Sequence, residues 1–292
     1  MNKEKIKSIV YLLGKSLGVL GVLFVFYKLS TEYTLSTFFE DFYSLLAIMP
    51  VLLLLNIIGT LVGIYAWHIM LLHYAKKPFP YYSSYYYFAK TEISKYLPGN
   101  IFHFIGRQAL SSKMGVTQKE MVKISFLLSF LLLAATVFSS MILASISKLL
   151  PLYMVLLTLL ASIILIIVII FVYPTFPMRK KIQMNLLLVV SVTMQGMMLG
   201  TIMLYQSTDM SVAQFYLFVS IYIVSWLIGF ITPGASGGLG VREGTFIAIS
   251  TFLHIDLATE VIVFSVLMVR LINIVIDILM YLSTYVFENK MK

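Results

Sequence analysis

Long apolar runs separated by short polar segments dominate the chain. A helix that crosses a bilayer needs roughly 20 apolar residues. Seven segments meet this need, namely residues 6–29, 44–72, 124–146, 152–173, 184–205, 212–230 and 260–287, and residues 241–254 are a possible eighth. The runs are unbroken, whereas the strands of a membrane barrel alternate apolar and polar positions. The pattern therefore predicts an all-α integral membrane protein with seven or eight transmembrane helices, including a retained first span and a kink at Pro50.

Two polar interruptions stand out within this pattern. The first, residues 96–107, reads YLPGNIFHFIGR, and the second, residues 231–244, reads ITPGASGGLGVREG. Proline and glycine break helices, and irregular backbone at membrane depth is tolerated only where protein covers it or water reaches it. A Pro-Gly pair precedes an arginine by the same interval in both, from Pro98 to Arg107 and from Pro233 to Arg242. We expect two broken re-entrant segments in a single polytopic domain, with a possible internal repeat of halves 1–148 and 149–292.

Composition supports the membrane class and limits the chemistry. The 292 residues are 60% hydrophobic and 11% charged, whereas a soluble domain is about half apolar and about a quarter charged. The net charge of +9 resides in short loops, which indicates orientation and contact with anionic lipid rather than nucleic-acid binding. The positive-inside rule places the N-terminus in the cytoplasm and leaves the side of the C-terminus open.

Several kinds of chemistry find no support in the sequence. The chain has no cysteine, and its four histidines lack metal-ligand spacing, so we expect neither a metal site nor a bound cofactor. His103, within the first interruption, could titrate, although a buried and satisfied histidine is the favoured interpretation. No nucleotide-binding or hydrolase motif is present, which disfavours ATP-driven transport by this chain alone.

The two arginines of the interruptions are candidate ligands for phosphate. A guanidinium binds phosphate through two parallel hydrogen bonds, and helix N-termini next to a break add free N–H groups. We expect Arg107, Arg242 and the glycine-rich backbone to hold an anionic lipid headgroup. The alternative is structural, in which Arg107 pairs with Glu92 and Arg242 pairs with Glu243. Lys95 and its neighbours on the preceding tyrosine-rich segment are expected at the membrane interface.

The last span carries a polar stripe. Arg270 and Asp277 are two helical turns apart and share a face, and Asn273 lies near that face. Polar residues in a membrane helix face the bundle interior, so the stripe either lines a pathway or relays protons. The equally weighted alternative is a neutralised Arg–Asp network that fixes helix packing.

Three spans also contain two glycines four residues apart, a spacing that lets helices approach closely. We expect these pairs to serve packing within the bundle rather than dimerisation. They are Gly14 and Gly18, Gly59 and Gly63, and Gly196 and Gly200.

The two interruptions resemble the paired motifs of a known family. Residues 95–99 (KYLPG), followed by Arg107, and residues 233–244 (PGASGGLGVREG) are similar to the lysylphosphatidylglycerol synthase transmembrane-region family, the flippase-like membrane part of the bacterial multiple peptide resistance factor. Family members commonly have more glycine and an acidic residue where this chain has residues 100–104 (NIFHF). The resemblance implies lipid translocation in a bacterial or archaeal plasma membrane. Because the aminoacyltransferase domain is not present, it does not imply lysyl transfer or an enzyme.

The leading functional prediction is a lipid flippase for an anionic phospholipid or a polyprenyl-phosphate-linked lipid. The alternatives are an accessory subunit for a partner glycosyltransferase or synthase, and a membrane transferase that uses Glu243 or Asp277 as a base. The predicted substrate-binding residues are Lys95, Pro98, Gly99, His103, Arg107, Pro233, Gly234, Gly237, Gly238, Gly240, Arg242, Glu243, Arg270, Asn273 and Asp277.

Overall fold

The computed structural model describes residues 35–97, 101–149, 152–171, 176–207, 209–253 and 258–288, together with residues 12, 19, 20, 23 and 27. Throughout this part the chain is helical, without strands. The helices are α2 (Leu35–Leu45), α3 (Met49–Tyr74), α4 (Tyr81–Glu92), η1 (Ile93–Tyr96), α5 (Phe102–Ala109), η2 (Ser111–Met114), α6 (Gln118–Ser147), α7 (Leu152–Phe171), α8 (Met178–Gln206), α9 (Val212–Ile231), η3 (Ser236–Gly238), α10 (Val241–Phe252) and α11 (Thr259–Phe287).

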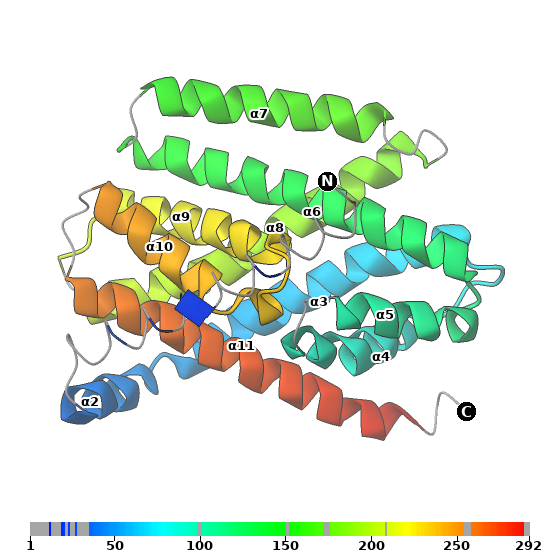
Figure 1. Ribbon diagram of the computed structural model, residues 1–292, viewed down its shortest axis with the longest axis horizontal. Helices are drawn as coiled ribbons and strands as arrows, with labels where there is room; N and C mark the ends of the chain where they lie inside the picture. Colours follow the sequence, from blue (N-terminus) through cyan, green and yellow to red (C-terminus); the bar gives the residue numbers. More distant parts are fainter. Residues whose placement is uncertain are drawn as a thin grey trace.

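Five of these helices are long and apolar enough to cross a membrane: α3, α6, α8, α9 and α11. The prediction of an all-α, multi-pass membrane protein is therefore confirmed, whereas the count of seven or eight crossings stays a prediction. The first predicted span, residues 6–29, lies almost entirely outside the described residues. The fourth forms α7, which packs on α6 at one edge of the bundle (Figure 1).

The predicted kink at Pro50 is wrong. The chain turns at residues 46–48, and Pro50 lies in the first turn of α3. A proline is well suited to this position because the N–H that it lacks would have no partner inside the helix. The second span therefore starts at Met49 rather than at residue 44.

Close helix packing depends on two of the glycine pairs. A Cβ at Gly59 or Gly63 of α3 would lie 3.1 Å and 2.9 Å from atoms of α8. On the other face of α8, a Cβ at Gly196 or Gly200 would lie 2.9 Å and 2.7 Å from side chains of α9. These four glycines thus serve packing inside the bundle, as predicted, and Gly14 and Gly18 lie outside the described residues.

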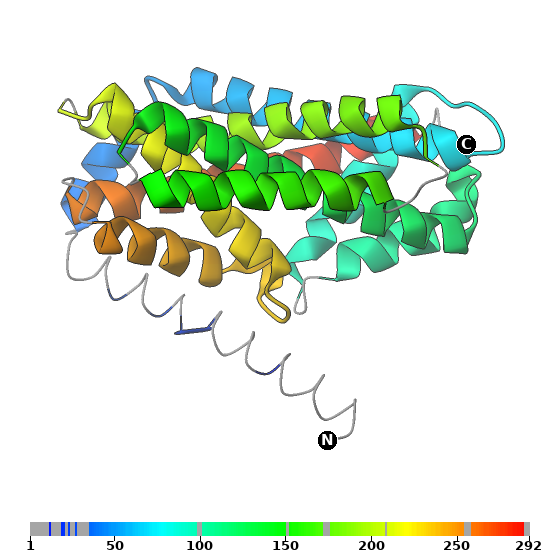
Figure 2. The same ribbon diagram turned by 90° about the horizontal axis from the view of Figure 1, so that it is seen from above.

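Two helical hairpins meet in the middle of the molecule. The first consists of α4, η1 and α5, and the second of α9, η3 and α10. They enter from opposite ends of the bundle, and their tips meet about halfway along its length (Figure 1), near the lower edge of the view in Figure 2. The short helices η1 and η3, one at each tip, contact each other.

The second hairpin also determines where the last helix ends. Helix α10 returns to the end of the bundle where α9 begins, and α11 then runs the full length to the opposite end (Figure 1). There Phe287 packs on Tyr85 of α4, beside the end of α3 and the beginnings of α6 and α8. The basic segments that contain Lys76, Lys123 and Lys180 gather at this end, so α11 finishes on the side that carries them.

Candidate functional site

A cavity of about 230 Å³ lies where the two hairpin tips meet. Both tips contribute to its wall, and so do residues near the middle of α3, α6, α8 and α11. Its polar lining consists of Asn56, Thr60, Glu92, Lys95, Tyr96, His103, Arg107, Ser129, Ser191, Gln195, Tyr222, Arg242, Arg270, Asn273 and Asp277. Apolar side chains complete the wall, among them Phe88, Phe104 and Trp226.

Glycines give the second hairpin tip its shape. Gly237, Gly238 and Gly240 have φ angles of +54°, +73° and +76°, in the left-handed region that costs other residues about 1–2 kcal/mol. A Cβ on Gly238 would lie 3.1 Å from the backbone of Gly229, so the tip also lies directly against α9. The sequence GGLG therefore turns the chain within the bundle and aims the start of α10 at the cavity.

Two arginines converge on one carbonyl at this tip. The Gly237 oxygen accepts hydrogen bonds from Nη1 of Arg270 at 2.8 Å and from Nη2 of Arg242 at 3.4 Å. Each guanidinium also faces an aromatic ring: Arg242 lies 5.7 Å from the Trp226 centroid and Arg270 lies 5.4 Å from that of Tyr96. The rings and the carbonyl fix both side chains without neutralising either.

Several N–H groups of these arginines remain without a partner. Arg242 is 8% exposed and Arg270 is 7% exposed. Within the described part of the chain, Nε of Arg242 and both Nε and Nη2 of Arg270 have no hydrogen-bond partner. A buried polar group without a partner costs about 1–3 kcal/mol, and more if it is charged. These N–H groups are therefore open to an acceptor beyond the described part of the chain.

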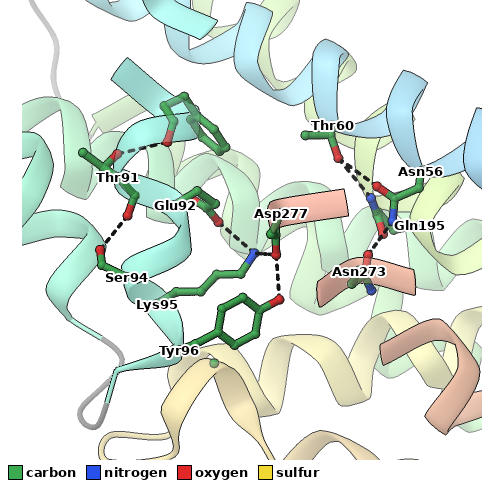
Figure 3. A network of polar contacts seen from close by, with 12 residues as sticks. Asn56, Thr60, Thr91, Glu92, Ser94, Lys95, Tyr96, Gln195, Asn273 and Asp277 are labelled. Carbon is green, nitrogen blue, oxygen red and sulfur yellow. Dashed lines mark hydrogen bonds and ion pairs between the residues drawn. The ribbon is translucent and has the colours of Figure 1, made fainter. Parts of the chain in front are cut away.

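The other cations of the cavity are paired with carboxylates, and Figure 3 shows part of this network. Nη2 of Arg107 lies 2.6 Å from Oε2 of Glu92. Nζ of Lys95 lies 3.1 Å from Oε1 of Glu92 and 2.8 Å from Oδ2 of Asp277, and that same Asp277 oxygen accepts a hydrogen bond from the Tyr96 hydroxyl at 2.6 Å. The network thus ties the first hairpin to α11.

Electrostatics at the first hairpin, which is not among the five candidate spans, favours charged partners around a neutral histidine. Burial alone would raise the pKa of Glu92, but Lys95 and Arg107 outweigh it and lower that pKa to about 2. Burial lowers the pKa of His103 to about 4. Glu92 is therefore ionised and His103 is neutral at pH 7.

A row of amides and hydroxyls also lines the cavity, and of its members the sequence predicted only Asn273. Asn56 donates to Asn273 at 2.5 Å, Thr60 donates to Asn56 at 3.3 Å, and Gln195 donates to Thr60 at 3.4 Å (Figure 3). These residues lie singly within long apolar runs. An isolated amide within a membrane span is costly unless it faces a polar partner. Asn56 and Gln195 could therefore have been predicted from the sequence to face the interior of the bundle.

The structure brings eight of the predicted site residues to the cavity: Lys95, His103, Arg107, Gly237, Arg242, Arg270, Asn273 and Asp277. Of the others, Pro233 is exposed, Gly234, Gly238 and Gly240 shape the tip, and Pro98 and Gly99 lie outside the described residues. Lys95 and Glu92 line the cavity, and the position at the membrane interface expected for this segment stays a prediction.

The expected structural pairings are correct in one case out of three. The Arg107–Glu92 ion pair is present. Glu243 instead accepts a hydrogen bond from the Gly240 N–H at 2.8 Å, and among the described residues no ion pair joins it to Arg242 within 4.0 Å. Asp277 pairs with Lys95 rather than with Arg270 on its own helix.

His103 also differs from its favoured interpretation. It is buried, but its Nδ1 has no hydrogen-bond partner in the described part of the chain. The ring lies 4.0 Å from that of Phe104, centroid to centroid. A neutral imidazole on the cavity wall offers one donor and one acceptor to a bound group.

No group of three or more metal-ligating side chains occurs among the described residues. No family model matches the chain, and no curated protein shows significant similarity to it.

Proposed function

We propose that the protein moves an anionic phospholipid or a lipid-linked anionic substrate between the two leaflets of a plasma membrane. In this proposal the headgroup occupies the cavity while the acyl or polyprenyl chains remain in lipid. The observation that carries it is the pair Arg242 and Arg270, whose N–H groups are buried, charged and partly without partners beside that cavity.

The depth of the cavity supports this proposal. The residues that line it lie near mid-length of four long helices, for example Thr60 of α3, Val192 of α8 and Asn273 of α11. If these helices cross the bilayer, the cavity lies near its midplane, and the two hairpins are the re-entrant segments expected from the sequence. Transporters built from broken helices commonly bind their substrates at this depth.

The charge distribution supports an orientation. The basic segments around Lys76, Lys123 and Lys180 gather at one end, and the positive-inside rule makes that end cytoplasmic. The second hairpin then enters from the outer side and the first from the inner side. With α11 ending among the basic segments, the described chain finishes on the cytoplasmic side.

Reconstitution tests the proposal. Purified protein is reconstituted in liposomes that contain fluorescent phosphatidylglycerol or polyprenyl phosphate. An impermeant reductant quenches only the label in the outer leaflet, so the protein should increase the rate at which label from the inner leaflet becomes accessible and is quenched. The double variant Arg242→Gln/Arg270→Gln should lose most of this activity, whereas Arg179→Gln, at an exposed arginine in the first turn of α8, should keep it. No transfer by correctly folded protein would reject the proposal and favour the accessory-subunit alternative.

A further inference from the structure

The charges that line the cavity do not balance. Four cationic side chains, Lys95, Arg107, Arg242 and Arg270, share it with two carboxylates, Glu92 and Asp277. Both carboxylates are within ion-pair distance of Lys95 or Arg107. Two positive charges, those of Arg242 and Arg270, therefore remain without a carboxylate on the cavity wall.

Glu243 is a further buried carboxylate to consider. It acts electrostatically on Arg270 but does not line the cavity. Its Oε2 accepts the Gly240 N–H, so the carboxylate lies at the N-terminus of α10, where the partial positive charge of the helix offsets it. The two arginines consequently keep most of their combined charge for a ligand.

We infer that the cavity prefers a phosphate group with two negative charges, a phosphomonoester or a diphosphate, over a phosphodiester with one. This inference depends on the proposed function and specifies the substrate class of the same site. A single charge would leave one buried guanidinium without a counter-ion, whereas two charges match the pair. Unpaired buried charge is strongly destabilising. Of two lipids with the same chains, the one whose phosphate carries two charges should therefore bind more tightly.

Free hydrogen-bonding groups of three residues line the same cavity. Arg270 uses Nη1 on the Gly237 carbonyl, and its unpartnered Nε and Nη2 form the edge of the guanidinium that binds two oxygens at once. Arg242 adds its free Nε from α10. The His103 imidazole adds its unpartnered Nδ1 from the first hairpin, which donates in the tautomer that carries the proton on this nitrogen. These groups together suit a phosphate with three or more terminal oxygens.

The test compares two short-chain lipids that differ by one methyl group. Dihexanoyl phosphatidic acid and its methyl ester, dihexanoyl phosphatidylmethanol, are titrated into detergent-solubilised protein by calorimetry. At pH 8 a phosphomonoester with a second pKa of about 6 is doubly ionised. Tryptophan fluorescence of a Trp67→Phe background, in which Trp226 beside Arg242 is the remaining tryptophan, provides a second readout. Inorganic phosphate is titrated in parallel to separate a lipid headgroup from a free anion.

We expect the phosphomonoester lipid to bind about tenfold or more tightly than its methyl ester, the ratio that one further charged hydrogen bond supplies. Arg270→Gln should reduce this ratio to about threefold or less, and Arg242→Gln should act in the same direction. Arg179→Gln, at an exposed arginine, should leave it unchanged. Thermal unfolding of each variant verifies that the protein is folded.

The possible failures are distinguishable. Equal affinity for the two lipids would overturn the inference and leave the proposed function standing. Inorganic phosphate that binds as tightly as the phosphomonoester lipid would retain the dianion site but argue against a lipid substrate. Absence of binding by any of the three probes to the folded wild-type protein would overturn both.

Discussion

Substitutions of Arg107 and Glu92 test whether Arg107 stabilises the fold, in contrast to the ligand-binding role proposed for Arg242 and Arg270. Arg107 is 4% exposed, its Nη2 lies 2.6 Å from Glu92, and its guanidinium lies 4.4 Å from the Phe88 centroid and 5.2 Å from that of Trp67. This environment differs from that of Arg242, which has no carboxylate partner among the described residues. We therefore expect Arg107→Met to impair stability first.

The magnitude follows from the burial of the pair. Removing one partner of a buried ion pair costs about 3–5 kcal/mol, because the other charge remains buried. Glu92 is 17% exposed and keeps Lys95 as a partner, so the lower end, about 3 kcal/mol, applies to Arg107→Met. At about 2–4 °C per kcal/mol, Tm should fall by about 6–12 °C. Glu92→Gln should cause a similar fall.

The double variant Arg107→Met/Glu92→Gln tests whether the two residues stabilise the protein as an ion pair or independently of each other. The double variant leaves neither charge unpaired. Its Tm should therefore fall by less than the sum of the falls of the two single variants, which corresponds to a coupling energy of about 1–3 kcal/mol. Thermal unfolding in detergent measures all three variants, and Arg179→Met is the control for loss of an exposed arginine. Unchanged Tm for Arg107→Met together with abolished lipid transport would refute the reasoning and make Arg107 a substrate ligand.

Three further predictions concern the tips and the packing. Gly237→Ala should weaken binding of dihexanoyl phosphatidic acid about tenfold in calorimetry, because it strains a backbone at φ +54° and places a Cβ 3.1 Å from Nη2 of Arg270. Asp277→Asn should lower the free energy of unfolding by about 1–3 kcal/mol in thermal melts, since Lys95 loses a partner at 2.8 Å. Gly200→Ala should cost about 1–3 kcal/mol in the same assay, because its Cβ would lie 2.7 Å from side chains of α9. Normal lipid binding by Gly237→Ala, or unchanged melting of either of the other two variants, would contradict the corresponding argument.

The sequence predicted the helices that span the bundle because twenty apolar residues have few other stable arrangements. It also identified Arg107, Arg242 and Arg270, since charge within such runs is costly without a purpose. It could not predict partners, because pairing depends on which faces meet. Asp277 lies two turns from Arg270 on one helix, yet η1 brings Lys95 closer to it, and only the tertiary arrangement shows this.

The direction of the second hairpin was equally beyond sequence reasoning. The sequence predicts residues 212–230 as a full span, and α9 is long and apolar enough to be one. What the sequence does not indicate is that α10 packs back along α9, so that the two form a hairpin with η3 at its tip (Figure 2). The spacing of Gly229 and Gly238 permits the close contact, but a glycine pair alone does not indicate which segments approach each other.

Under the proposed function, the Gly237 carbonyl would allow a site this polar both to bind a headgroup and to release it. Two guanidinium groups buried beside each other would be unstable with no acceptor, and an acceptor that satisfied them fully would leave nothing for a ligand. The Gly237 oxygen accepts one N–H from Arg242 and one from Arg270. It therefore stabilises both guanidinium groups in part, but as a neutral group it does not cancel the charge of either. The gain on binding is thus limited to the remaining donors and the net charge. The proposed transport would require this limit, since a site that held the headgroup more tightly would retain it.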